Sequence, residues 1–430
     1  MFLQNRLSAW SARVRTQIAP PLRIELWNGQ RIDLSSEPPR VTIRLPRASA
    51  VRYLLTPSLS NLGAAYVEGL IEVKGAANDI IAIVNALARA TLKAEGKFAR
   101  IVRSIGHDKL ADAEAIRYHY DVSNEFYAKF LDPQLVYSCA YFERGDETLA
   151  AAQNKKLDHI LRKIRLRPGQ SLLDIGCGWG ALVLRAAREY GARCVGVTLS
   201  ENQCALARER VERAGLTRQI EIRLQDYREV DGRFDRITSV GMFEHVGARH
   251  LAQYFACVER LLAPDGVALN HGITSTDPDN GQTPYGGGAF IGRYVFPHGE
   301  LVHLGQVLKA MQQGRLEALD VENLRRHYAR TCAIWTDNFE ANAAEIRQLA
   351  GERRFRIWHV YLAGCRYAFE HDLISLYQIV CGKAGRHPAV LPWSRRYMYE
   401  GAREGLGEEV GELALEATTE AKAGLISGAR

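Results

Sequence analysis

The chain has 430 residues, of which 47% are hydrophobic and 24% are charged, and this ordinary globular composition predicts two or three domains. Because no stretch approaches about 18 consecutive apolar residues, we expect no membrane-spanning helix, and the start shows no pattern of a secretory signal. Eight scattered cysteines without a Cys-x-x-Cys pair exclude a disulfide framework and a zinc site, so we expect a cytoplasmic protein without a metal.

The charge is unevenly distributed along the chain. Residues 1–110 hold 16 Lys and Arg against 8 Asp and Glu, a net charge of +8, whereas the remaining residues hold 40 and 41. A basic N-terminal quarter on a near-neutral body indicates an anionic partner, either membrane phosphate or nucleic acid. Solvated surface charge without a partner is the alternative.

The first twenty residues predict an amphipathic helix. Leu3, Leu7, Trp10, Val14 and Ile18 follow one another at steps of three or four, which places them on one helical face, and three arginines accompany them. Such a helix can lie on an anionic membrane. It can equally dock its apolar face on the domain behind it.

Residues 22–100 resemble a small α+β module. Strands are predicted at Arg23–Trp27 and Val41–Leu45, and a strand pair within Tyr66–Gly75. A helix follows from about Ile80, with Asn78 as its cap. We therefore expect a basic domain over residues 1–105 and a linker over 106–117.

From residue 118 onward strands alternate with helices, which is typical of a parallel sheet with crossover helices. This predicts an α/β domain over residues 118–400, with an irregular cap inserted at about 275–330, a helical pattern at 338–381 and a flexible tail at 401–430. The predicted strands are Ser171–Ile175, Cys194–Leu199, Ile220–Leu224, Phe234–Val240 and Gly266–His271, and the predicted helices include Gly180–Tyr190 and Gln203–Ala214.

A glycine-rich loop follows the first of these strands. Gly176, Gly178 and Gly180 allow a tight turn and a close approach of the backbone to a ligand. Their spacing alone fits either a dinucleotide or S-adenosylmethionine (SAM). Asp174 just before the loop favours SAM, because a carboxylate there can hold the cationic amino group of the ligand. A ligand-free turn is the alternative.

The next two strand ends supply further candidate contacts with SAM. The first of them offers hydroxyl groups at the position where many nucleotide sites carry an acid for the ribose. On the other, Asp226 is placed to accept from the adenine amino group and Tyr227 to pack on its ring. The predicted contacts on these two segments are Thr198, Leu199, Ser200, Gln203, Asp226, Tyr227 and Arg228.

Three further segments, YHYDVSNEFY (118–127), YSCAYF (137–142) and SVGMFEHVG (239–247), complete a pattern with the glycine loop and VGVTLSENQ (195–203). In this order they resemble the cyclopropane-fatty-acid synthase family, whose members include the mycolic acid cyclopropane synthases. The resemblance runs from about residue 118 to 390, and more weakly over 35–100. It implies a Rossmann-like SAM-dependent methyltransferase sheet with a helical or irregular cap, preceded by a small α+β N-terminal domain of lipid-binding type.

The resemblance also implies a reaction. Members of the family transfer the SAM methyl to one carbon of a cis double bond, the other carbon becomes cationic, and loss of a proton closes a cyclopropane ring. A bound bicarbonate is the base. By motif match its ligands are Cys139, Glu244, His271, the backbone of Ile273, and Tyr328. The carry-over also gives Cys365 an active-site role and adds Tyr137 and Ser138 to the SAM contacts.

The substrate and partners follow from the same resemblance. Because family members with an extra N-terminal domain act on whole phospholipids, unsaturated phospholipids are the expected substrate. An anionic membrane surface is then the expected partner of the basic quarter, at the inner membrane face, with no nucleic acid and with a homodimer as the assembly. The alternatives are a lipid methyltransferase giving 10-methylene or 10-methyl chains, an RNA methyltransferase, and a catalytically dead lipid-binding protein.

Overall fold

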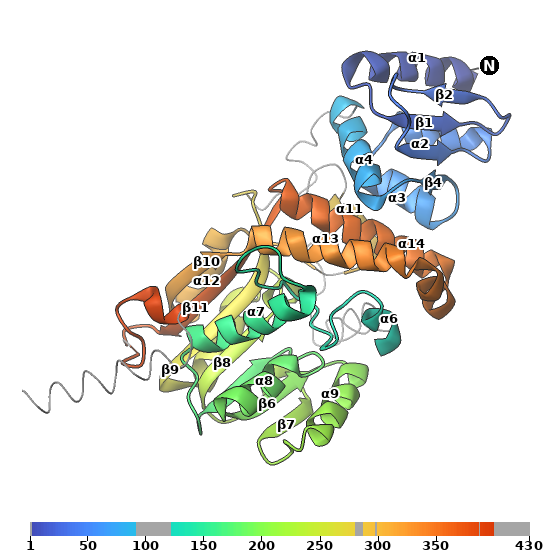
Figure 1. The fold of residues 1–430 in the computed structure, drawn as a ribbon. Coiled ribbons are helices and arrows are strands. Elements are labelled where there is room, and N and C mark those ends of the chain that lie inside the picture. Colours follow the sequence, from blue (N-terminus) through green and yellow to red (C-terminus); the bar gives the residue numbers. More distant parts are fainter. Residues whose placement is uncertain (1, 92–121, 280–286, 297–298, 387, 400–430) are drawn as a thin grey trace, which may run out of the picture.

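The computed structural model describes residues 2–91, 122–279, 287–296, 299–386 and 388–399 (Figure 1). We call residues 2–91 the N-terminal module and residues 122–399 the main domain. The predicted linker and tail lie outside the described residues. Within these ranges every helix is too short or too polar to span a bilayer.

The N-terminal module has a four-stranded sheet in the order β2-β1-β3-β4, in which β1 and β3 are parallel and the outer pairs are antiparallel. Its elements are α1 (Phe2–Gln17), β1 (Leu22–Glu25), β2 (Arg31–Asp33), β3 (Val41–Arg44), η1 (Ala48–Ala50), α2 (Val51–Leu55), α3 (Leu59–Val67), β4 (Glu72–Lys74) and α4 (Ala77–Thr91).

The apolar face of α1 is used inside the module. Leu7, Trp10 and Val14 are buried in the same hydrophobic core as the strands. Arg15 Nε also donates to the backbone oxygen of Asp33 at 2.8 Å. The prediction that the helix docks on its own domain is therefore confirmed, and the alternative, in which this face lies on a membrane, is wrong.

Two local predictions in the module are wrong. Tyr66–Gly75 is not a strand pair, because α3 continues to Val67 and only Glu72–Lys74 is extended. The side chain of Ser58 starts α3 by accepting from the backbone N–H of Asn61, and leucine spacing then buries one face of the helix. Asn78 lies within the first turn of α4 rather than at its cap.

The main domain is built on a seven-stranded sheet in the order β10-β11-β9-β8-β5-β6-β7. The five strands β5–β9 are parallel, and β10 and β11 run antiparallel at one end. The strands are β5 (Ser171–Ile175), β6 (Arg193–Thr198), β7 (Ile220–Leu224), β8 (Phe234–Val240), β9 (Leu262–Ser275), β10 (Leu316–Asn323) and β11 (Ile374–Lys383). This confirms the predicted Rossmann-like sheet.

Helices cover both faces of this sheet because its central strands are apolar on both sides. Leu172 packs into a core with α7, α8 and α9, whereas its neighbour Leu173 points to the opposite face, into a core with α10 and α12. The helices on the two faces are α7 (Leu149–Lys163), α8 (Ala181–Tyr190), α9 (Glu201–Arg213), α10 (Leu251–Leu261) and α12 (Leu304–Gln313).

The structure corrects the expected cap. Within 275–330, β10 is an edge strand of the sheet and α12 covers one of its faces, and β11 is a strand within the segment predicted as helical. Because β11 is buried on both faces, its apolar run has no alternation that distinguishes a strand from a helix. The other elements are α6 (Asn124–Ala128), η3 (Tyr227–Glu229), η4 (Phe243–His245), α11 (Gly287–Tyr294), α13 (Arg325–Ala341), α14 (Ala343–Glu370) and η6 (Arg395–Met398).

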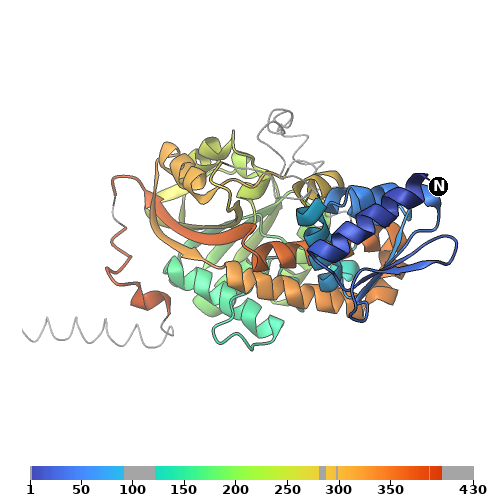
Figure 2. The same ribbon diagram turned by 90° about the horizontal axis from the view of Figure 1, so that it is seen from above.

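The N-terminal module packs against α11 and α14, and two views agree on this placement (Figures 1 and 2). The buried residues of both parts form one continuous hydrophobic core. Polar contacts border it: Arg353 pairs with Glu68 at 3.0 Å, and Glu340 Oε1 accepts from the backbone N–H of Ala77 at 3.0 Å. The module is therefore held on the helices of the main domain by both apolar and polar contacts.

Candidate active site

The glycine loop lies at the point where the order of the strands in the sheet reverses, beside the carboxyl ends of β5 and β8. Gly176, Gly178 and Gly180 all have positive φ angles, of +78°, +54° and +82°. A Cβ on Gly176 would stand 2.7 Å from Cγ of Met242, in the segment after β8. Only glycine therefore allows this turn and this close approach. Such a switch point is the usual ligand crevice of an open α/β sheet.

A cavity of about 440 Å³ opens at these strand ends, and we call it the strand-end cavity. Most of the predicted SAM contacts line it, from the loop before α7 and from the ends of three strands of the sheet. Gly180 and Ser200 do not, because Gly180 begins α8 and the Ser200 hydroxyl caps α9 by accepting from Gln203 N–H. The predicted residues in the wall are Tyr137, Ser138, Asp174, Gly176, Gly178, Thr198, Leu199, Gln203, Asp226, Tyr227 and Arg228.

Two of these wall residues are already fixed by neighbours. Asp226 forms an ion pair with Arg228 at 2.6 Å and also accepts from the Arg228 backbone N–H at 2.9 Å. Thr198 Oγ1 donates to Gln203 Oε1 at 3.0 Å. The polar groups at the far strand ends are thus held in place by one another.

Asp174 is the buried carboxylate of the strand-end cavity. Its side chain is 3% exposed and accepts a hydrogen bond from Thr238 Oγ1 at 2.8 Å. Burial raises the pKa of Asp174 to about 6. A carboxylate with so little water around it favours a cationic ligand group beside it.

Lys156 of α7 lines the same cavity and was missed by the sequence reasoning. It is 2% exposed, and its ammonium group donates to Ser138 Oγ at 2.8 Å. Burial lowers the pKa of Lys156 to about 8. The available signal was its position: Lys156 falls on the apolar face of α7, together with Leu149, Leu157 and Ile160.

We take three of the predicted base ligands together as a first group, because Glu244 of η4 contacts β9, the strand that carries His271 and Ile273. The backbone N–H of Ile273 donates to Glu244 Oε1 at 2.9 Å. The second carboxyl oxygen of Glu244 and the Nε2 atom of His271 are both buried, and neither has a hydrogen-bond partner among the described residues. Two polar atoms left open in this way mark a place that is built for a further polar group.

The other two predicted base ligands, Cys139 and Tyr328, lie around α13 and α14 together with Cys365, the further residue predicted to have an active-site role. Cys139 Sγ donates to the oxygen of Ala140 at 3.2 Å, and burial raises the pKa of this thiol. Tyr328 stacks on Phe369, with 4.5 Å between the ring centres. Burial also raises the pKa of the Cys365 thiol, to about 12. No hydrogen bond joins this group to the first one among the described residues, and no member of either group lines the strand-end cavity.

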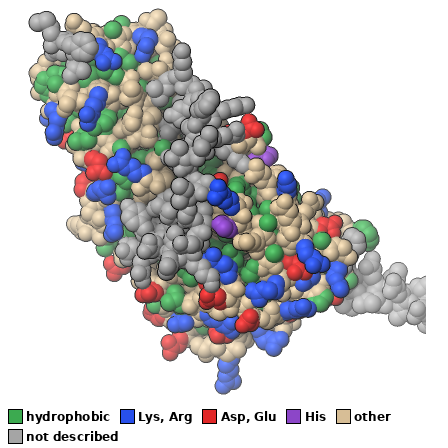
Figure 3. Space-filling model, turned by 180° about the vertical axis from the view of Figure 1, so that it is seen from behind, with side chains coloured by type: hydrophobic (Ala, Val, Ile, Leu, Met, Phe, Trp, Pro, Cys, Tyr) green, Lys and Arg blue, Asp and Glu red, His purple; other side chains and the backbone are tan. Residues whose placement is uncertain are grey.

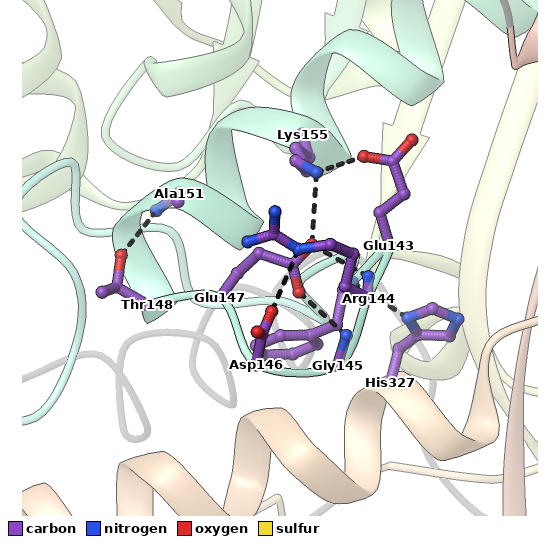
Figure 4. Close-up of polar contacts among 10 residues, drawn as sticks. Glu143, Arg144, Gly145, Asp146, Glu147, Thr148, Ala151, Lys155 and His327 are labelled. Atoms are coloured by element: carbon purple, nitrogen blue, oxygen red, sulfur yellow. Dashed lines mark hydrogen bonds and ion pairs between the residues drawn. The ribbon is translucent and has the colours of Figure 1, made fainter.

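The loop that carries Tyr137–Phe142 is fixed from both sides. Glu147 accepts from the backbone N–H groups of Arg144 and Gly145 at 3.0 Å each, and from Lys155 at 3.2 Å (Figure 4). On the other side, the backbone N–H of Phe142 donates to His327 Nδ1 at 3.0 Å. This loop therefore joins the cavity wall at Tyr137 to the thiol of Cys139 in one rigid segment.

Comparison with known proteins places these features in a family. A family model described as mycolic acid cyclopropane synthetase matches residues 107–379, which is more than half of the chain. A second model, described as a domain of unknown function, matches residues 9–96.

Individual relatives agree with this match. A Pseudomonas putida protein named as a probable fatty acid methyltransferase is 46% identical over 384 residues, covering 88% of this chain and 96% of the relative. The cyclopropane-fatty-acyl-phospholipid synthase of Escherichia coli K12 is 40% identical over 262 residues, covering 61% of this chain and 66% of the relative.

Solved structures give the same result. The cyclopropane synthase MmaA2 from Mycobacterium tuberculosis is 35% identical with a TM-score of 0.61, covering 63% of this chain and 98% of that one. The mycolic acid cyclopropane synthase CmaA1, complexed with SAH and CTAB, is 35% identical with a TM-score of 0.60 over the same shares. This chain therefore belongs to the mycolic acid cyclopropane synthetase family and is a SAM-dependent methyltransferase.

Proposed function

We propose that this enzyme converts cis double bonds in the acyl chains of unsaturated phospholipids into cyclopropane rings, with bicarbonate as the base. The observation that carries the proposal is the pair of open buried atoms, Glu244 Oε2 and His271 Nε2, in the same domain as the strand-end cavity. The similarity to a cyclopropane-fatty-acyl-phospholipid synthase supports the choice of substrate.

The proposed reaction balances as follows. SAM supplies the methyl group: its carbon–sulfur bond breaks as a bond forms to one alkene carbon, and S-adenosylhomocysteine leaves. The other alkene carbon becomes cationic. The new methyl then loses a proton to the base, and the electron pair of that C–H bond closes the ring.

Glu244 and His271 fit a small oxyanion because each presents a hydrogen-bond donor. Burial raises the pKa of Glu244 to about 7, so its open oxygen carries a proton in much of the population near neutral pH. Burial holds the pKa of His271 well below its usual range, so the imidazole is neutral. Gln378 Nε2 donates to His271 Nδ1 at 3.2 Å, which leaves the proton of the neutral ring on Nε2.

The fit to the remaining predicted ligands is less direct. The backbone N–H of Ile273 donates to Glu244 and so fixes the orientation of that carboxyl group. It could bind an anion only as a second, shared acceptor. Burial raises the pKa values of Cys139 and Tyr328, so both are neutral hydrogen-bond donors. Cys365 is likewise a neutral buried thiol, and the chemistry requires no thiolate there.

Aromatic rings surround the region between the cavity wall and α13. Tyr137 stacks close to Trp335, with 5.3 Å between the ring centres, and Trp335 meets Tyr328 at 5.9 Å. Their faces can stabilise a cationic carbon. A buried aromatic surrounding also excludes the water that would otherwise trap the cation as an alcohol.

The N-terminal module supports contact with an anionic membrane. Several of its arginines pair with acids, as in Arg23 with Asp33 and Arg44 with Glu72. Exposed basic side chains without an ion pair within the described part of the module include Arg13, Arg47, Arg52 and Lys74. Figure 3 shows basic side chains on this module and both signs intermixed over the main domain. Location at the inner membrane face and a homodimer remain parts of the proposal.

A second product class requires a direct test, because the Pseudomonas putida relative, which covers 88% of this chain, is named as a probable fatty acid methyltransferase. A hydride shift within the same cation, followed by loss of a proton from the new methyl, would give a 10-methylene chain, and a two-electron reductant would then be needed to reach a 10-methyl chain. We expect incubation with SAM, bicarbonate and vesicles of cis-unsaturated phospholipid to give ring protons by NMR at a mass increase of one CH₂. A methylated chain without ring protons would assign the second product class.

Glu244→Gln is expected to lower turnover by about 100-fold, or about 3 kcal/mol of barrier, while SAM affinity changes little. The amide can still accept from Ile273 but no longer shares a proton with the anion. Turnover on vesicles and calorimetric binding of S-adenosylhomocysteine measure the two effects. Removal of bicarbonate should lower turnover of the unaltered enzyme far more than that of the variant. Unchanged turnover would remove Glu244 from the mechanism.

The same variant is expected to be more stable at alkaline pH. The raised pKa of Glu244 means that the unfolded chain loses this proton above about pH 4.5 while the folded chain keeps it up to about pH 7, so folding is penalised as pH rises. Urea unfolding measures the free energy of unfolding of the variant minus that of the wild type. This difference should be about 2 kcal/mol larger at pH 8 than at pH 5. The exposed Glu212→Gln on α9 is the control, and an equal gain at both pH values would contradict the assignment.

Reversing the charge of Arg13 and Arg47 together to Glu should weaken binding to anionic vesicles about tenfold or more, because each basic residue near such a surface contributes about 1 kcal/mol. Arg218→Glu with Arg233→Glu, both exposed on the main domain, makes the same change in net charge. Vesicle sedimentation at fixed salt compares the two. Equal weakening by both double variants would show that net charge, not the module, directs binding.

A further inference from the structure

Lys156 is a buried cation in the wall of the strand-end cavity, and no step described above uses it. Its ammonium group has three N–H bonds, and the contacts of the described residues give it one acceptor, Ser138 Oγ at 2.8 Å. A lysine that is 2% exposed is rare without an opposite charge beside it. The cavity side of Lys156 therefore has room for an anionic group.

Asp174 stands in the same wall with the opposite charge. The two groups influence each other electrostatically, yet no hydrogen bond or ion pair joins them in the described structure. Asp174 has one hydrogen-bond donor there, the Thr238 hydroxyl. The buried Asp132 also acts electrostatically on Lys156 but does not line the cavity, so within the cavity wall Lys156 and Asp174 have no ion-pair partner among the described residues. A ligand that carries both signs at one end satisfies the two together.

We propose that Lys156 binds the carboxylate of the amino-acid end of SAM, while Asp174 binds its amino group. An α-amino acid holds these two charges on adjacent atoms, which matches one acid and one base in the same wall. Ser138 holds the Lys156 ammonium in place. This inference rests on SAM being the ligand of the strand-end cavity.

The bicarbonate of the proposed mechanism is the other oxyanion that such a cation could bind. Lys156 does exert an electrostatic effect on Cys139 and His271. However, Lys156 lines the cavity together with Ser138 and Asp174, whereas Glu244 and His271 do not line it. Its geometry therefore favours the carboxylate of SAM. Burial lowers the pKa of Lys156 to about 8. An anion bound beside it would raise that pKa again and so stabilise the charged form of the lysine.

Two ligands test the inference by calorimetry on the full chain: S-adenosylhomocysteine, which carries the amino-acid end, and 5′-methylthioadenosine, which lacks it. Lys156→Met should weaken binding of the first by about tenfold or more and leave the second unchanged. Lys156→Gln, which keeps a polar contact with Ser138, should give the same pattern. Lys163→Met is the matched control, because Lys163 lies two turns further on the same helix, is fully buried and pairs with Glu322 outside the cavity wall.

Retained binding of 5′-methylthioadenosine shows that a variant is folded. The inference is overturned if the binding of both ligands weakens equally or if the binding of neither weakens. It is also overturned if both Lys156 variants lose the binding of both ligands, because Lys156 would then be required for folding. It is also overturned if S-adenosylhomocysteine binds normally while the bicarbonate requirement for turnover rises, which would assign Lys156 to the base. If the unaltered enzyme binds neither ligand, the assignment of the cavity to SAM fails instead.

Discussion

The reversal of strand order beside β5 is the constraint on which the site depends. The chain leaves β5 through α8 toward β6, and after β7 it crosses back to place β8 on the other side of β5. The connections that leave β5 and β8 therefore run to opposite sides, and a crevice opens between them. Gly176 and Met242 approach too closely for any side chain at position 176. The glycine loop, the strand-end cavity and the buried Asp174 all follow from this one crossing.

Burial governs the charges of the site. It moves the pKa values of Asp174, Lys156, Glu244 and His271 all toward the neutral forms. Keeping four such groups away from water is unfavourable for folding. The same dryness serves the chemistry, because a cationic carbon survives only where water is excluded. Glu244 shows the connection most directly: in the proposed mechanism, the proton that burial keeps on its carboxyl group is the one offered to bicarbonate.

Sequence patterns predicted the parallel part of the fold well, because buried strands there are bounded by glycines and acids at regular spacing. Ser171–Ile175, Ile220–Leu224 and Phe234–Val240 agree with β5, β7 and β8 to the residue. The sequence patterns failed for β11, because a strand that is buried on both faces lacks the alternation of apolar and polar residues. They also failed for the end of α3, which was predicted to be extended.

The cavity wall was predictable to a similar extent. Motifs named most of its lining, yet Gly180 and Ser200 turned out to shape helix starts instead. Lys156 has no motif around it; only its place on an apolar helix face marks it. Whether two such residues share a cavity is decided by tertiary packing, which spacing along the chain does not contain.

The helices of the main domain connect the basic module to the cavity. Glu340 of α13 accepts from the module at Ala77 and also from His359 of α14, at 2.9 Å. Half a turn beyond His359, the hydroxyl of Tyr361 accepts from that of Tyr137, in the cavity wall, at 3.2 Å. These contacts tie the position of the N-terminal module, the proposed membrane contact, to that of α14. Since α14 also carries Cys365 next to the aromatic region, the same helix links the proposed lipid-facing module to the proposed acyl-chain site.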